Sequence, residues 1–156
     1  MAAPAASPWF AGVLVGFDLE TTGTDPSSAR VVTAAISYVA PSGVLLPRSR
    51  EWIVDPGVEI PDGARAVHGI STEQARRAGG PALTGLWEIL DELEAVCAAG
   101  LPLVVFNAPY DLTLMDAEAA RYGLPGLRRR RAFEDALVVD PLVIDRFVDA
   151  LDSKSV

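Results

Sequence analysis

The sequence has 156 residues, 50% of them hydrophobic, and a formal net charge of -8. This length suits one domain with a sizeable core, and the acidic balance argues against a general affinity for phosphate backbones, which depends on Lys and Arg. No apolar run approaches the roughly 18 residues that cross a bilayer, the start lacks a secretion signal, and the single Cys97 cannot form an internal disulfide. We therefore expect a cytoplasmic protein without membrane contact.

The first part of the chain predicts three strands in a meander. They are buried apolar runs separated by turn-rich segments, and they lie at 13–20, 31–40 and 50–55. The Pro/Ala-rich residues 1–8 are expected to form a loose tail. Residues 9–156 then make up one domain, since no repeat or linker divides them.

The rest of the chain alternates helices and strands. Ser71 and Gln74 have the spacing of a capping box, which predicts a short helix at 72–78. Apolar residues at helical spacing predict further helices, at 83–98, at 110–121 and from 141, the last with Val143, Phe147 and Leu151 facing inward. Continuous apolar runs predict strands at 101–107 and 136–140. This order indicates an α/β fold with a mixed β-sheet flanked by helices.

The stretch GFDLETTGTDP, residues 16–26, ends an apolar strand in two carboxylates. Alternate residues of a strand face the same side, so Asp18 and Glu20 are expected to point together and to repel unless a cation neutralises them. Carboxylate oxygens suit Mg²⁺ or Mn²⁺, and a pair of such ions is a common device for phosphodiester cleavage. Hydrated acids at an exposed strand end are the alternative, whereas a calcium loop is excluded because its twelfth position would be Ala29.

A second acidic position favours the metal interpretation. The segment VVFNAPYDLTLM, residues 104–115, places Asn107 at the end of a strand and Asp111 at the start of the next helix. Ligand crevices in open α/β sheets form at such strand ends. Taken alone, Asp111 could equally be a carboxylate that stabilises a helix N-terminus.

FDLETTGTDP and NAPYDLTLM resemble the first and second motifs of the DEDD exonucleases, including the epsilon-type proofreading subunits of bacterial DNA polymerase III. The resemblance, from about Val13 to Asp149, implies a ribonuclease H-like fold and a metal-dependent 3′-to-5′ exonuclease. It implies two Mg²⁺ or Mn²⁺ ions, the 3′ end of DNA or RNA as substrate, and a DNA polymerase subunit as partner.

The resemblance also assigns roles to single residues. Asp18 matches the acid that bridges both ions, Glu20 the acid that holds the ion activating water, and Asp111 the acid that serves the other ion. Thr21 and Thr22 match positions that line the terminal nucleotide, and Asn107 is grouped with them as a substrate-binding residue.

His68 is the single histidine of the sequence. The resemblance places the segment His68-Gly69-Ile70 beside the nucleotide pocket, which implies a contact with substrate. A hydrogen bond to the backbone before the helix that begins at Thr72 is an equal alternative.

Members of this family close with a helix that carries H-x-x-x-x-D, and no histidine follows residue 68 here. We therefore expect the closing C-terminal helix to be missing, with a truncated and impaired nuclease as the result. The alternative is a non-catalytic remnant, or a module that binds nucleic acid or a polymerase. The acids Asp145, Asp149 and Asp152 are at helical spacing and predict a solvated face.

Two further features have less specific interpretations. Asp140 follows the strand at 136–140 and predicts a helix cap, not a metal ligand. Arg128 to Arg131 is the strongly basic run of the sequence. It is either a guide for a phosphate backbone or a solvated loop.

Overall fold

A computed structural model describes residues 8–152, so the predicted tail at 1–8 lies, apart from Pro8, outside the described residues. Six strands form one mixed sheet of order β4-β3-β2-β1-β5-β6. The antiparallel meander consists of β1 (Leu14–Thr21), β2 (Val31–Val39) and β3 (Arg50–Asp55). Short parallel strands extend it at both edges, namely β4 (Gly80–Pro81), β5 (Leu103–Val104) and β6 (Val138–Val139).

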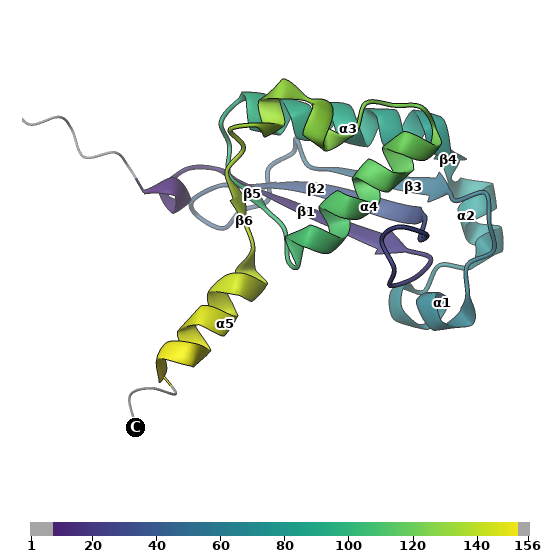
Figure 1. The fold of residues 1–156 in the computed structure, drawn as a ribbon, viewed down its shortest axis with the longest axis horizontal. Coiled ribbons are helices and arrows are strands. Elements are labelled where there is room, and N and C mark those ends of the chain that lie inside the picture. The colour runs from purple at the N-terminus through teal and green to yellow at the C-terminus, as the bar shows by residue number, and fades with distance from the viewer. Residues whose placement is uncertain (1–7, 153–156) are drawn as a thin grey trace, which may run out of the picture.

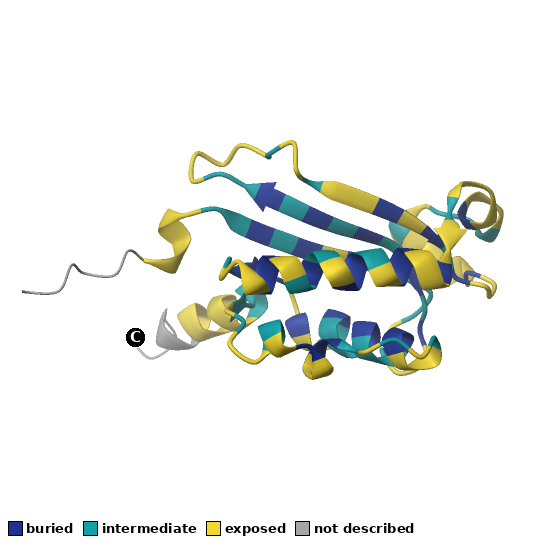
Figure 2. Ribbon diagram, turned by 90° about the horizontal axis from the view of Figure 1, so that it is seen from above, coloured by how far each residue is buried: buried dark blue, intermediate teal, exposed yellow. Residues whose placement is uncertain are grey.

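Two long helices, α3 (Ala82–Ala98) and α4 (Ala108–Arg121), lie on the same face of the sheet (Figures 1 and 2). The main core forms between them and the strands and includes Val15, Phe17 and Leu19 of β1. Gly85 lets α3 approach β3, because a Cβ added there would be 2.9 Å from Cγ2 of Val54. The short helices α1 (Asp62–His68) and α2 (Thr72–Ala78) lie together beyond one end of the meander (Figure 1).

The predicted fold class is confirmed, since the chain forms a mixed β-sheet with flanking helices in an α/β architecture. The predicted capping box is also present: Oγ of Ser71 accepts from the Gln74 N–H at 3.2 Å, and Oε1 of Gln74 accepts from the Ser71 N–H at 2.8 Å. Within residues 8–152, no helix has the length and apolar character needed to cross a membrane.

The orientation predicted for the last helix is wrong. This helix, α5 (Pro141–Asp152), projects away from the sheet (Figure 1), and Val143 and Phe147 are 60% and 64% exposed instead of buried. Helical spacing identifies the residues that share a face, but it does not say whether another element covers that face. The Leu151 side chain lies outside the described residues, as does that of Asp152, whereas Asp145 and Asp149 are exposed as predicted.

Candidate functional site

The end of β1 places Asp18 and Glu20 on one face of the sheet. Asp18 is exposed, Leu19 is buried in the core and Glu20 is partly buried, which is the alternation that the sequence predicts. Glu20 pairs with Thr33 of β2, but the register then shifts, so that Thr21 pairs with Val31. The extra residue of this bulge is Val32 of β2, so β2 is the strand that it bends.

The start of α4 is fixed by a carboxylate from the neighbouring strand end. Asn107, with φ 57° and ψ 47°, has the left-handed conformation that asparagine tolerates better than most residues. Asp140 accepts from the Asn107 N–H at 2.9 Å and from the Ala108 N–H at 3.0 Å. It also accepts from the Leu142 N–H of α5 at 3.0 Å, which confirms the predicted cap and shows that Asp140 caps two helices.

Asp111, in the first turn of α4, is buried close to the other two acids. Asp111 is only 5% exposed. This burial, and after it the charges of Asp18 and Glu20, raise the pKa of its carboxyl group from 3.8 to about 7. Hydrogen bonds from the backbone N–H groups of Leu19 and Asp111 itself oppose this rise. Asp111 is distant from Asp18 and Glu20 in the sequence, but it therefore lies within electrostatic range of both in the structure.

The donor set fits a hard divalent cation by its chemistry. It offers only carboxylate oxygens, which Mg²⁺ and Mn²⁺ prefer. Among the described residues, no ion pair involves Asp18, Glu20 or Asp111, so no basic side chain neutralises them there. However, no group of three Asp, Glu, His or Cys side chains within residues 8–152 is arranged closely enough to hold a metal ion as it stands.

A cavity of about 450 Å³ lies beside Glu20 and brings together four of the predicted site residues. One side is formed by the β1 end and the turn after it, and the other by α1 and the residue before it. The lining residues are Glu20, Thr21, Thr22, Gly23, Thr24, Pro61, Gly63, Ala64, Val67 and His68. Asn107 does not line this cavity and is exposed at the start of α4.

His68 makes the backbone contact that one of its two interpretations predicts, and the contact with substrate stays a prediction. Its Nδ1 accepts a hydrogen bond from the Ile70 N–H at 3.1 Å, so the backbone contact is present. In the neutral ring the proton is then on Nε2, which is buried without a hydrogen-bond partner among the described residues. The His68 residue also lines the cavity.

The hydroxyl groups of Thr21 and Thr22 take part in internal hydrogen bonds. Oγ1 of Thr21 donates to the Gly23 carbonyl at 2.8 Å and lies 2.7 Å from Oη of Tyr110. Oγ1 of Thr22 accepts from the Arg30 N–H at 2.9 Å, which closes the loop between β1 and β2. The sequence motifs assign no role to Tyr110, the residue directly before Asp111. Its hydroxyl group contacts the turn after β1.

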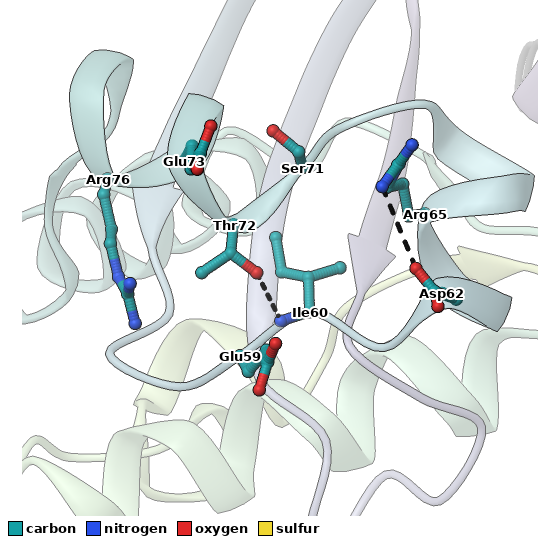
Figure 3. Close-up of a pocket in the computed structure, with 8 residues that line it drawn as sticks. All are labelled: Glu59, Ile60, Asp62, Arg65, Ser71, Thr72, Glu73 and Arg76. Carbon is teal, nitrogen blue, oxygen red and sulfur yellow. Dashed lines mark hydrogen bonds and ion pairs between the residues drawn. The ribbon is translucent and has the colours of Figure 1, made fainter.

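Two other features lie outside this site. A pocket of about 460 Å³ at α1 and α2 (Figure 3) has charges of both signs and contains none of the predicted site residues. In the basic run, Arg128 pairs with Asp116 at 3.1 Å and the buried Arg130 pairs with Glu94. Two of the four arginines therefore have structural partners and belong neither to a purely solvated loop nor to a free cationic patch.

The arrangement of elements is similar to that of exonuclease I from E. coli. The structure of that enzyme with a 5cy-dA13 oligonucleotide matches with a TM-score of 0.73 and 20% identity, over 90% of this chain and 30% of that chain. The complex with a dT13 oligonucleotide matches at 0.70 and 18%, over 90% and 30% of the two chains. The zinc-bound form of a complex with single-stranded DNA matches at 0.69 and 16%, over 86% and 29%.

These similarities establish the fold alone, because the identities are low. The chain spans about 30% of the length of the exonuclease I structures it matches. No protein-family model matches the chain, and no curated protein matches it in sequence. The predicted ribonuclease H-like architecture is thereby confirmed.

Proposed function

We propose that this domain is a metal-dependent nuclease of the DEDD 3′-to-5′ exonuclease type, with Asp18, Glu20 and Asp111 as the acids that bind the cation. The observation that carries the proposal is the raised pKa of Asp111, about 7, caused by burial and by Asp18 and Glu20. Three acids without a basic partner, in a fold similar to that of a nuclease, are expected to attract a divalent cation.

Each residue has a task that its position supports. Bound Mg²⁺ or Mn²⁺ would supply positive charge that stabilises the negative charge developing on a phosphodiester. Asp111 is buried at the start of α4, Asp18 is exposed, and Glu20 also lines the cavity. We expect the cleaved bond to lie near the acids and the terminal nucleotide to lie in the cavity.

The cavity supports a nucleotide as ligand. Pro61, Ala64 and Val67 offer an apolar wall for the flat face of a base, and His68 lines the cavity beside them. One of the exonuclease I structures is a complex with single-stranded DNA, in agreement with a single-stranded 3′ end of DNA or RNA as substrate here. The motif resemblance to epsilon-type subunits makes a DNA polymerase subunit the proposed partner.

Calorimetric titration with Mn²⁺ tests the metal site. The native protein is expected to bind Mn²⁺, and Asp18→Ala to bind it at least about 10-fold more weakly, because a direct ligand is removed. Asp145→Ala, which changes an exposed acid of α5, is the control for the loss of one negative charge. Identical isotherms for the native protein and Asp18→Ala would contradict the proposal. Release of nucleotides from 3′-labelled single-stranded DNA by the native protein, absent in Asp18→Ala, then tests the activity.

A second candidate function is nucleic-acid or polymerase binding without cleavage. It is favoured by the single histidine, His68, whose Nδ1 is already bonded to the Ile70 N–H and is therefore not a free base. A general base contributes typically about 10²- to 10⁴-fold to a rate. Retention of a labelled oligonucleotide that stays intact in the presence of Mn²⁺ would favour this function over the first.

A further inference from the structure

Helix α4 contacts the backbone on both sides of Glu20. Before Glu20, the backbone N–H of Leu19 lies close enough to the carboxyl group of Asp111 to lower its pKa. After Glu20, Oη of Tyr110 lies 2.7 Å from Oγ1 of Thr21 and donates to the Gly23 carbonyl. Since Tyr110 and Asp111 are consecutive residues, one turn of helix lies against the chain on either side of Glu20, with its hydrogen bonds on the side of Thr21 and Gly23.

Of the neighbouring strands, β2 pairs with this part of β1 and β5 does not. The ladder with β2 is irregular between Glu20 and Thr21, where the partner changes from Thr33 to Val31. On the other edge, β5 pairs with β1 only at Val15 and Gly16. The extra residue of this bulge is Val32 of β2, so Glu20 keeps a strand partner on one edge alone, and contacts from other elements contribute to fixing its direction.

The contact of Tyr110 can be removed without destroying the turn. Three close contacts join Tyr110 Oη, Thr21 Oγ1 and the Gly23 carbonyl, but the two hydroxyl groups have only two protons to donate. Without the tyrosine hydroxyl, Thr21 still donates to Gly23 at 2.8 Å. Phenylalanine at position 110 therefore keeps the turn and the ring but removes the connection to α4.

We propose that the Tyr110 hydroxyl is a positioning group, which fixes Glu20 relative to Asp111 so that both carboxylates can approach the same divalent cation. The inference rests on the proposed function. Tyr110 is neither a metal ligand nor a substrate contact in this account. It acts through the side chain of Thr21 and the backbone of Gly23, in the way that outer-shell hydrogen bonds orient metal ligands.

The test compares Tyr110→Phe with Tyr122→Phe. Tyr122 follows the same helix, and its hydroxyl accepts a hydrogen bond from Arg30 at 3.5 Å, away from the three acids. Each variant loses a hydroxyl contact, so both are expected to lower the melting temperature of the metal-free protein by no more than about 2–4 °C. Only Tyr110→Phe is expected to weaken Mn²⁺ binding, by about 10-fold, in calorimetric titration.

Equal Mn²⁺ affinity of Tyr110→Phe and the native protein would overturn the inference. If the native protein itself shows no Mn²⁺ binding in the titration, the proposed function is contradicted instead. The native titration therefore distinguishes this failure from a failure of the inference on Tyr110. Amide hydrogen exchange of residues 20–23 in the metal-free proteins then tests the positioning role of Tyr110 without any metal. Exchange about 10-fold faster in Tyr110→Phe than in Tyr122→Phe supports the positioning role, and equal exchange in the two overturns it.

Discussion

Asp111 is the residue at which burial and negative charge act together. A carboxyl group with a pKa of about 7 in the folded protein, raised from 3.8, binds its proton more tightly in the native than in the unfolded state. The free energy of unfolding therefore falls as the pH rises from about 4 to about 7 in the metal-free protein. Above this pH range the Asp111 carboxylate is negatively charged beside Asp18 and Glu20. A divalent cation would neutralise this charge.

Asp111→Asn is expected to remove this pH dependence. The difference in unfolding free energy between native protein and variant should change with pH by at most about 1.4 kcal/mol per unit between pH 4 and 7, because one proton is involved. Urea unfolding of the metal-free proteins at several pH values measures it. Asp145→Asn, at an exposed position of α5, should keep the native pH profile. Parallel profiles for Asp111→Asn and the native protein would disprove the assigned shift.

At the residue scale, sequence patterns predict which residues share a face of a strand better than they predict the burial and contacts of each residue. Strand alternation is enough to place Asp18 and Glu20 on one face, as the structure has them. The burial of Asp111 and the contact of Tyr110 with the turn after β1 depend on how α4 packs against β1. Such packing joins segments distant in the chain, and local spacing contains no information about it.

At the scale of elements, Asp140 joins two helices through one carboxylate. It accepts from the N–H groups of Asn107 and Ala108 at the start of α4 and from Leu142 in α5. Asp140→Ala is expected to lower the free energy of unfolding by about 1–2 kcal/mol, the usual cost of losing a cap. Chemical denaturation measures it, with Asp145→Ala as the control on an exposed acid. Equal stability of the two variants would show that water replaces the cap.

The elements differ in how well their sequences define them. The meander strands and α2 match their predicted ranges closely, because turn residues and the capping box mark their ends. The apolar runs at 101–107 and 136–140 contain only the short strands β5 and β6. An apolar run shows that a segment is buried, but the number of paired residues depends on the neighbouring strand. The exposed apolar side of α5 shows the same dependence on tertiary context.

At the scale of the whole molecule, negative charge dominates. The net charge is -8, and many arginines already have acidic partners in the described structure. The paired arginines are Arg30, Arg48, Arg50, Arg65, Arg121, Arg128 and Arg130. A phosphate backbone approaching this surface meets few uncompensated cations, so a divalent ion at the three acids would provide much of the attraction.

Binding of a single-stranded oligonucleotide is therefore expected to require a divalent cation. In the presence of a chelator, the dissociation constant should be no tighter than about 10⁻⁴ M at physiological salt, the weak end of non-specific binding. Mn²⁺ should tighten binding to the native protein but not to Asp18→Ala, as measured by fluorescence anisotropy with an oligonucleotide whose linkages resist cleavage. Tight binding in chelator that depends steeply on salt and is lost in the double variant Arg129→Glu, Arg131→Glu would instead locate the contact at the arginine run. The acids would then serve the chemistry alone, because the attraction of the strand would come from Arg129 and Arg131, both exposed.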